Sequence, residues 1–242
     1  MNTLSAIIPT FCEVERIEQA VRAAAAVADE VIVCDGGSAD GTVDRAAAAG
    51  ARVVTAPKGR GRQLHAGASV ACGDTLLFLH ADARLPPAAR AAIAHALADD
   101  AVAGGNFHLR FTPASPVARL FTWANDARRR WLRIYYGDSA LFVRRTVYER
   151  LGGFAPLPIL EDHEFVRRLE RHGRTVYVRD VTVEVSARRF EHAPLRALGA
   201  WAAIHALYAA GVPPERLARL YHDTRETDPG RDRRAKGICR EA

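Results

Sequence analysis

The feature that most constrains the fold is a regular alternation of short apolar runs with helix-like segments through the first hundred residues. The apolar runs are rich in Ile, Val and Leu and lie at 4–10, 30–35, 51–56 and 74–82. Most of the segments that follow them carry apolar residues at helical spacing, with Pro at some starts and Gly at some ends. Strands separated by helices pair in parallel. The pattern therefore predicts an α/β fold with a mostly parallel central sheet and helices on both faces.

The alternation becomes irregular after residue 100. We expect long helices at 115–133 and 160–173, and separate strands at 102–111, 175–180 and 181–186. A helical C-terminal extension runs to about residue 222. We therefore expect a single domain over 1–222, and a charged, flexible tail over 223–242 that is rich in Arg, Asp, Gly and Pro.

Composition narrows the function only slightly. The 242 residues are 49% hydrophobic and 26% charged, a balance that argues against wholesale disorder. The net charge of +6 suits an anionic partner, and nucleic acid, acidic lipid and nucleotide phosphate all fit that sign. No run reaches the roughly 18 apolar residues of a membrane span, and we see no signal peptide. We expect a cytoplasmic protein, with peripheral contact at the inner membrane surface as an open alternative.

Acidic residues follow three of the predicted strands. In an open parallel sheet, ligands bind beyond the carboxyl ends of the strands, and Glu13, Asp35 and Asp82 fall there. Two glycines after Asp35 would let a ligand approach the backbone closely. The alternative is a strand–turn–helix junction in which side chains such as Ser38 and Asp40 only cap the turn and the next helix. The turn alone leaves both interpretations open.

Five motifs, in this order, resemble the family 2 glycosyltransferases: "AIIPTFCEVERI", "VIVCDGGSADGT", "LLFLHADARLP", "YGDSALFVRRTVYERLGGF" and "LPILEDHEFVRRL". The resemblance covers roughly residues 3–190. The segments "FLHADARLP" and "GGFAPLPILEDHEFVRRL" are most similar to those of a small bacterial subgroup, the radical-SAM/selenodomain-associated transferases. The family implies a Rossmann-like GT-A fold, with a nucleotide-binding half at about 1–100 and an acceptor and catalytic half at about 101–222.

The resemblance also implies residues for the donor. Pro9, Thr10 and Glu13 match the segment that lines the base and ribose, and Asp35 matches the acid that accepts a hydrogen bond from the base. A carboxylate suits the imide N–H of uracil, so we expect a UDP-sugar. The segment "APKGRGRQLHAG" matches a loop from which a few side chains could approach the base, ribose or pyrophosphate; these candidates are Arg60, Arg62 and His65. For each of them a solvated basic loop is the alternative.

Asp82 occupies the last position of the family's Asp-x-Asp motif, which implies a divalent cation, Mg²⁺ or Mn²⁺, bridging the diphosphate. The chain departs from the motif because His80 replaces the first acid. We expect Asp82 to be the metal ligand and His80 to contact the ribose, with His80 coordination as the alternative. Farther along, Arg189 is a candidate to close over the diphosphate, and His192 is a possible further ligand.

Glu161 and Asp162 begin a predicted helix, where acids complement the helix dipole in many proteins. The resemblance gives Asp162 a chemical role as the general base that deprotonates the acceptor in an inverting transfer. Glu161 would then support the acceptor or the loop.

One basic, Trp-containing segment, 126–133 with the nearby Trp123, suits a membrane surface or an acceptor. We expect instead that Trp123 and Trp131 pack inward and that the arginines are solvated.

The predicted function is therefore inverting transfer of a sugar from a nucleotide-diphosphate donor to a hydroxyl or carboxyl group of a small or lipid-like acceptor. Nucleic acid is not an expected partner, and the oligomeric state stays open. A non-catalytic nucleotide- or glycan-binding module is the main alternative, because the first acid of the metal motif is missing. A sugar nucleotidyltransferase is a weaker one, because no Gly-rich, Arg-containing loop follows the first strand. The absence of GxGxxG there disfavours a dinucleotide oxidoreductase.

Overall fold

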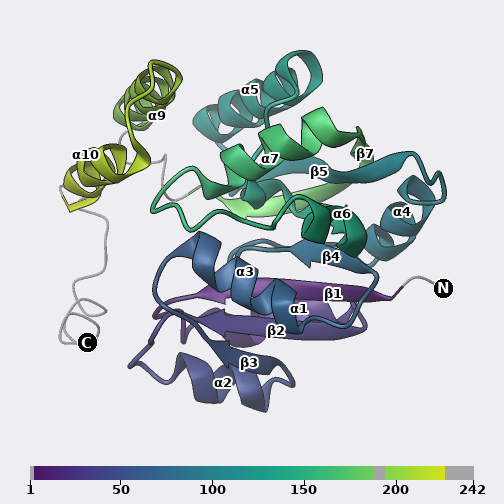
Figure 1. The fold of residues 1–242 in the computed structure, drawn as a ribbon. Helices are drawn as coiled ribbons and strands as arrows, with labels where there is room; N and C mark the ends of the chain where they lie inside the picture. The colour runs from purple at the N-terminus through teal and green to yellow at the C-terminus, as the bar shows by residue number, and fades with distance from the viewer. Residues whose placement is uncertain (1–2, 188–193, 227–242) are drawn as a thin grey trace.

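The computed structural model describes residues 3–187 and 194–226, whose arrangement is shown in Figure 1. In chain order the elements are β1 (Leu4–Thr10), α1 (Ile17–Ala25), β2 (Glu30–Asp35), α2 (Thr42–Ala48), β3 (Arg52–Thr55), α3 (Arg60–Val70), β4 (Thr75–Phe78), α4 (Ala88–Ala96), β5 (Val102–Thr112), α5 (Pro116–Leu132), the 3₁₀ turn η1 (Gly137–Ser139), β6 (Leu141–Arg144), α6 (Arg145–Arg150), α7 (Glu161–His172), β7 (Arg174–Ser186), α9 (Pro194–Ala209) and α10 (Pro214–Glu226).

Seven strands form one sheet in the order β3-β2-β1-β4-β6-β5-β7. β1 pairs in parallel with β2 and β4, β2 with β3, and β5 with β7. Only β6 among these strands runs antiparallel to its neighbours, β4 and β5. The predicted mostly parallel sheet is confirmed. The carboxyl ends of β1, β2 and β4 lie together at one edge, because these strands are adjacent and point the same way.

Helices cover both faces of the sheet, as predicted. On one face α1 and α4 bury side chains such as Ile17 and Ile93 against the strands, and α2 packs there too. On the other face α3 and α7 bury Leu64 and Phe165, beside α6. These helices bury apolar side chains against the sheet, as expected for layers that share a core. The consequence for the site is that α3 and α7 begin side by side at the same edge.

The prediction of two strands over 175–180 and 181–186 is wrong, because β7 is continuous. It pairs with β5 through a register shift: Phe107 lies opposite Val178, whereas His108 lies opposite Thr182. The extra residues on β7 form an irregularity within one strand. The sequence signal for a break therefore marks a local bulge and not a turn.

The C-terminal extension is helical, as predicted. In Figure 1 the yellow-green helices α9 and α10 lie beside the main body. Ile204 and Leu217 from these helices pack on Leu160 in the loop before α7. Helix α10 continues to Glu226, past the expected boundary at 222, and 227–242 lies outside the described residues. Within 3–187 and 194–226, no helix has both the length and the apolar character needed to cross a bilayer.

Helix α5 contradicts the prediction that its tryptophans pack inward. Trp123 is 66% exposed and Trp131 is 80% exposed, whereas Arg129 is only 6% exposed. Helical spacing alone does not say which side of the helix meets the sheet. Here the sheet offers polar partners, so an arginine is buried and two indole rings face solvent.

Candidate functional site

Asp35 ends β2, and its buried carboxylate organises the following turn. The Oδ2 atom accepts hydrogen bonds from the backbone N–H groups of Gly37 at 2.8 Å and Ser38 at 2.7 Å. The Oδ1 atom accepts from the hydroxyl of Ser38 at 2.5 Å and from that of Thr10 at 3.3 Å. Four donors match the roughly four lone-pair sites of a carboxylate. Asp35 therefore does accept hydrogen bonds from the turn that follows β2, as the alternative interpretation expected. The hydrogen bond from Thr10 is the longest of the four.

The loops after β1 and β2 are joined by a second set of hydrogen bonds. Asp40 Oδ1 accepts from the backbone N–H of Thr42 at 3.1 Å and from its hydroxyl at 2.5 Å. The Thr42 Oγ1 atom in turn accepts from the backbone N–H of Glu13 at 2.9 Å. The hydroxyl of Ser38 accepts from the backbone N–H of Cys12 at 2.8 Å. The segment predicted to line the base is thus fixed to the Asp35 turn.

Sequence reasoning missed Gln63, a buried residue of α3. Its Nε2 donates to the carbonyl of Thr10 at 2.6 Å and to that of Cys34 at 2.8 Å. Pro9 and Thr10 pair with Cys34 and Asp35 at the ends of β1 and β2. Gln63 therefore anchors α3 to both strand ends. The only sequence signal was its place inside the segment "GRGRQLHAG".

Asp82 lies half-buried in the turn after β4, close enough to Glu13 to affect its ionisation. Burial raises the pKa of Glu13; Arg16 opposes this, and the charges of Asp82 and Asp40 add to the rise. Among the residues that the structure describes, no group of three His, Cys, Asp or Glu side chains could hold a metal ion. Asp82, the predicted ligand, could supply one hard carboxylate oxygen. That fits a cation completed by donor phosphates and water, the usual setting for Mg²⁺.

A second charged group is formed by Arg60 at the start of α3 and by Glu161 and Asp162 at the start of α7. Arg60 Nε donates to Glu161 Oε1, and Arg60 Nη2 donates to Asp162 Oδ2 at 3.2 Å. Both acids are almost completely buried, whereas the Arg60 side chain is 38% exposed. The guanidinium therefore covers two buried carboxylates from the solvent side. The sequence placed Arg60 near the donor, and the structure places it against this acidic pair.

Asp162 receives two further hydrogen bonds that sequence reasoning did not anticipate. The backbone N–H of Gly137 donates to Oδ2 at 3.0 Å, and the backbone N–H of His163 donates to Oδ1 at 2.8 Å. Gly137 belongs to the motif "YGDSA", which carried the resemblance without an assigned role. The 3₁₀ turn η1 is thus what orients the carboxylate.

The surroundings of Glu161 and Asp162 shift the pKa values of their carboxyl groups in opposite directions. Burial alone would raise the pKa of Asp162, but Arg60, the backbone N–H groups of Gly137 and His163, and the nearby His80 together lower it below its usual range. Burial raises the pKa of Glu161, and Arg60 only partly offsets that rise. Adjacent carboxyls with divergent pKa values commonly mark sites of acid–base chemistry. Asp162 is the member of the pair whose ionised form its surroundings favour.

His80 faces this group from the end of β4. Its Nε2 lies 3.5 Å from Arg60 Nη1, which can donate to this ring nitrogen in the tautomer that leaves Nε2 without a proton. A β-carbon built on Gly137 would lie 3.3 Å from His80 Nε2 and 3.5 Å from Asp162 Oδ2. His80, Gly137 and Asp162 therefore surround one small space. His80, predicted to contact the donor, and Asp162, the predicted base, therefore lie close together.

The remaining candidates lie elsewhere. Arg62 and His65 line a cavity of about 500 Å³ between α3 and the loop 152–156, together with Arg168 of α7. No residue of the Asp35 turn lines that cavity, so these two side chains are separate from the strand-end acids. Arg189 and His192 lie outside the described residues.

The model of the family described as glycosyl transferase family 2 matches residues 5–156, which is more than half of the chain. The chain belongs to glycosyl transferase family 2. The protein is therefore a glycosyltransferase, and the predicted family and enzyme class are confirmed. The narrower radical-SAM subgroup stays a prediction. No curated protein shows a significant match to the chain.

Several solved structures have a similar fold. A mycobacterial protein is 26% identical with a TM-score of 0.54, over 76% of this chain and 65% of that one, slightly under two thirds of its length. Glucosyl-3-phosphoglycerate synthase from Mycobacterium tuberculosis, in complex with Mn²⁺, UDP-glucose and phosphoglyceric acid, is 24% identical with a TM-score of 0.61. That match covers 88% of this chain and 81% of the synthase. A complex of the same synthase with Mg²⁺ and UDP gives 23% identity and a TM-score of 0.59, over 88% of this chain and 80% of the synthase.

This family 2 glycosyltransferase thus carries two groups of candidate residues at one edge of its sheet. Asp35, Glu13 and Asp82 follow the parallel strands of the first half. Glu161 and Asp162 begin α7 in the second half, and Arg60 reaches them from α3. The first group supplies carboxylate oxygens that can accept hydrogen bonds or hold a cation, and the second has a buried carboxylate, Asp162, with a lowered pKa and a fixed orientation.

Proposed function

We propose that this glycosyltransferase moves a sugar, with inversion, from a UDP-sugar to a hydroxyl or carboxyl group of a small or lipid-like acceptor, and that Asp162 is the general base. The observation that carries the proposal is the Asp162 carboxylate. It is buried, held by Arg60 and the Gly137 N–H, and kept ionised by a lowered pKa. Inverting transfer needs one such base within reach of the acceptor hydroxyl.

In the proposed reaction, the acceptor oxygen attacks the anomeric carbon as its proton passes to a carboxylate oxygen of Asp162. The bond from the anomeric carbon to the diphosphate oxygen breaks, and that oxygen keeps the electron pair. Arg60 and the Gly137 N–H hold the carboxylate in place before the acceptor arrives, so little reorganisation is needed. Glu161 supports this arrangement by fixing the other arm of Arg60.

For the donor we propose that Asp35 accepts the imide N–H of uracil, which would take the place of the long contact from Thr10. Pro9, Thr10 and Glu13 would line the base and ribose. Asp82 would hold a divalent cation, which supplies charge neutralisation for the departing diphosphate. Support comes from the related synthase, whose structures contain UDP with Mn²⁺ or Mg²⁺. We assign His80 to the ribose and leave the cation to Asp82 and water.

One observation favours a second candidate, a module that binds nucleotide or glycan without turnover. His80 replaces the first acid of the metal motif, and the described residues form no three-ligand metal group. A family member that had lost catalysis would look the same there. The buried Asp162, which the resemblance implies as the base, favours the enzyme.

The test is the Asp162→Asn variant. We would incubate the protein with a panel of nucleotide sugars, Mg²⁺ or Mn²⁺ and candidate acceptors, and measure the released nucleoside diphosphate. The substitution keeps the size of the side chain but removes its charge and basicity. Transfer should fall by about 10²–10⁴, while calorimetry should show nearly unchanged donor affinity.

Glu164→Gln is the matched control, because it neutralises another acid of α7 that pairs with Arg168. It should leave the transfer rate within a few-fold of the parent. Near-normal transfer by the Asp162 variant would remove Asp162 as the general base, whereas the absence of transfer by the parent would favour the binding module. Loss of donor affinity instead would move Asp162 to the diphosphate site.

A further inference from the structure

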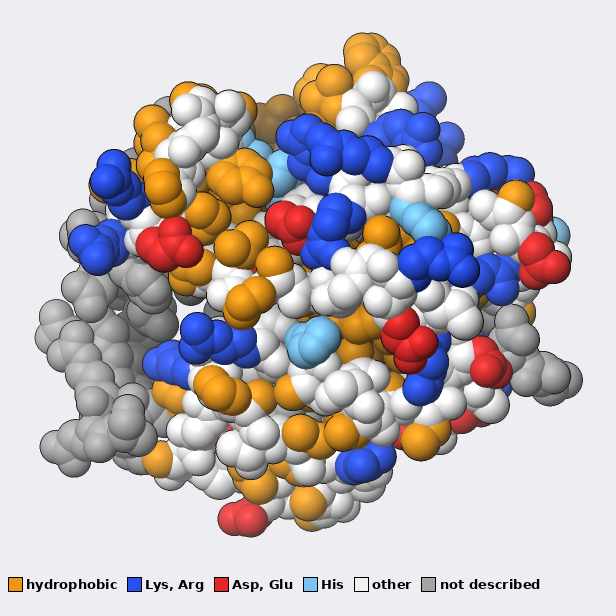
Figure 2. Space-filling model, viewed as in Figure 1, with side chains coloured by type: hydrophobic (Ala, Val, Ile, Leu, Met, Phe, Trp, Pro, Cys, Tyr) orange, Lys and Arg blue, Asp and Glu red, His pale blue; other side chains and the backbone are white. Residues whose placement is uncertain are grey.

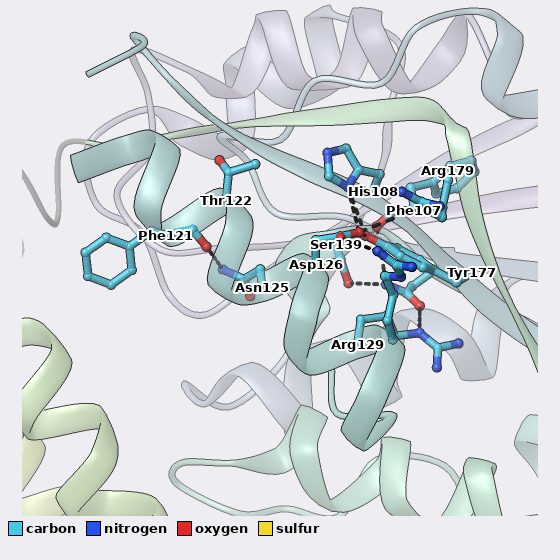
Figure 3. A network of polar contacts seen from close by, with 12 residues as sticks. Phe107, His108, Phe121, Thr122, Asn125, Asp126, Arg129, Ser139, Tyr177 and Arg179 are labelled. Carbon is cyan, nitrogen blue, oxygen red and sulfur yellow. Dashed lines mark hydrogen bonds and ion pairs between the residues drawn. The ribbon is translucent and has the colours of Figure 1, made fainter. Parts of the chain in front are cut away.

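Helix α5 is polar on the side that meets the protein. Arg129 is buried, and its Nε donates to Asn106 Oδ1 at 2.6 Å while its Nη2 donates to Thr175 Oγ1 at 3.0 Å. Figure 3 shows this network between α5 and strands β5 and β7. The ring of Tyr135 lies under the same guanidinium, 4.2 Å from its central carbon. A buried, hydrogen-bonded arginine therefore fixes how the helix is rotated.

Two more contacts fix the same rotation. The Tyr177 hydroxyl donates to Asp126 Oδ1 at 2.9 Å, and the Thr122 hydroxyl accepts from the backbone N–H of Phe111 at 3.1 Å. These partners lie on β7 and β5, so the inner face of α5 carries Thr122, Asp126 and Arg129. A surface helix of a globular protein usually has the opposite arrangement, with its apolar stripe inward.

The outer face of α5 carries the apolar stripe. Leu120 is 57% exposed, and it aligns with Trp123 and Trp131, which are more exposed still. The spacing of three and then eight residues, with Ala127 between them, keeps these side chains on one side of the helix. Figure 2 shows hydrophobic side chains at the top of the view, over α5, with Lys and Arg side chains beside them. Large apolar side chains grouped in this way mark an interaction surface.

The charge beside the stripe is positive. Arg119 is exposed, the Arg130 side chain is 49% exposed, and the Arg133 side chain is 56% exposed. The acids that pair with the last two are Asp126 and Glu170, whose side chains are 17% and 11% exposed. Solvent at this face therefore meets indole rings and guanidinium groups, with the neighbouring carboxylates turned inward.

We propose that this outer face of α5, defined by Leu120, Trp123 and Trp131 with Arg119 and Arg130 at its edge, docks on an anionic membrane surface. Tryptophan rings favour the boundary between headgroups and acyl chains, and arginines pair with lipid phosphates. The stripe runs along the helix axis, so α5 lies in the plane of the interface. A protein partner with an acidic apolar groove, or a second copy, is the competing occupant.

The position of α5 relates this surface to the proposed reaction. The helix ends at Leu132, and the chain then passes through Tyr135 and Tyr136 to Gly137, whose N–H bonds to Asp162. A bilayer at α5 would bring membrane lipids to the acceptor side of the site. This consequence rests on the proposed function, whereas the docking itself does not.

The experiment is sedimentation of the full chain with vesicles of phosphatidylcholine containing about one third phosphatidylglycerol, compared with phosphatidylcholine alone. The parent should bind the anionic vesicles, and binding should weaken as salt rises. Trp123→Ser combined with Trp131→Ser should lower the partition coefficient by roughly tenfold or more. Arg119→Gln combined with Arg130→Gln should lower it by about tenfold on anionic vesicles.

Matched controls remove the same kinds of groups from other helices. Leu207→Ser with Leu220→Ser deletes two exposed leucines of α9 and α10, and Arg22→Gln with Arg150→Gln neutralises two exposed arginines of α1 and α6. Both controls should bind vesicles within about twofold of the parent. UDP affinity, measured on every variant, separates failure of docking from failure of the nucleotide site.

Three outcomes would overturn the proposal. The first is a parent protein that does not bind anionic vesicles. The second is vesicle binding that the α5 variants and the controls share equally. The third is a concentration-dependent dimer in sedimentation velocity that the Trp123 and Trp131 substitutions dissociate, which would assign the face to a second copy. Blue-shifted tryptophan fluorescence that appears only with anionic vesicles, and disappears in the double Trp variant, would support docking directly.

Discussion

Replacing Arg60 with Met removes one positive charge and leaves two buried carboxylates side by side. Methionine has a similar length, so the change at the start of α3 is mainly electrostatic. In the parent, Arg60 pairs with both Glu161 and Asp162, whose side chains are 2% and 6% exposed. The substitution therefore tests whether this ion group stabilises the junction between α3 and α7.

The expected magnitude follows from burial. Removing one partner of a fully buried ion pair costs about 3–5 kcal/mol. Because the Arg60 side chain is 38% exposed, water can partly replace it, and we expect about 2–3 kcal/mol at pH 7.5. For a chain of this size that corresponds to a fall in Tm of roughly 4–12 °C.

The cost should depend on pH in a defined direction. In the parent, the pKa of Asp162 is lowered, so its contribution to stability is present above the unfolded-state pKa and is lost as pH falls through the folded pKa. The pKa of Glu161 is raised, so ionising it reduces stability as pH rises through its folded pKa. Without Arg60 the pKa values of both acids should move upward. The variant should then bind a proton more readily, and its deficit should shrink between pH 7.5 and pH 5.

Urea unfolding of the parent and of Arg60→Met at both pH values measures the effect. Arg60→Lys is the control, because lysine keeps the positive charge but lacks the planar guanidinium that pairs with both acids. Its loss of stability should be at most half of that of Arg60→Met. The double variant Arg60→Met with Glu161→Gln should cost less than the sum of the single changes, because one of the two repelling acids is gone. A loss below about 0.5 kcal/mol, or an equal loss at both pH values, would refute the reasoning.

Three further outcomes concern the proposed site. Asp35→Ala should weaken UDP binding roughly ten- to a hundredfold by calorimetry, as expected for losing a hydrogen bond to a charged acceptor; unchanged affinity in a folded variant would leave Asp35 as a turn residue only. Asp82→Ala should abolish the effect of Mg²⁺ or Mn²⁺ on donor binding, whereas His80→Ala should weaken binding but keep a metal response; the reverse result would make imidazole the ligand. Gly137→Ala should lower kcat/KM by about tenfold or more with little change in Tm, because its methyl group would enter the space between His80 and Asp162; full activity would show that this space is not used.

The parallel half of the sheet was predictable because each of its strands is an isolated apolar run followed by a helix. Strand β6 was harder to place. The apolar run at 140–143 is long enough for a short strand, but nothing local indicates that this strand inserts between β4 and β5 in the antiparallel sense. The long strand β7 was divided for the opposite reason, since Arg179 and Asp180 interrupt its apolar pattern at the bulge.

The site, like the fold, could be predicted only in part from the sequence. The acids at strand ends follow from topology, so Asp35 and Asp82 could be found from the sequence. The partner of Asp162 could not, because Arg60 lies 102 residues away along the chain and reaches it only through the packing of α3 beside α7. The hydrogen bond from the backbone N–H of Gly137 could not be predicted either, because every residue except proline has such a donor. Arg129 was misjudged because its burial depends on polar groups of β5 and β7 that the helix pattern does not contain.

The insertion of β6 has a consequence for biosynthesis. In the folded protein, one edge of β4 pairs with β1 and the other edge pairs with β6. Because β6 is synthesised after β1 and β4, the second edge of β4 stays unpaired until then. Until then, Leu76, Leu77 and Phe78 stand at an open edge that can pair with another nascent chain. Translation pauses or truncations between 79 and 140 should therefore promote aggregation, and a chaperone that shields this edge should be most useful before residue 144 is synthesised.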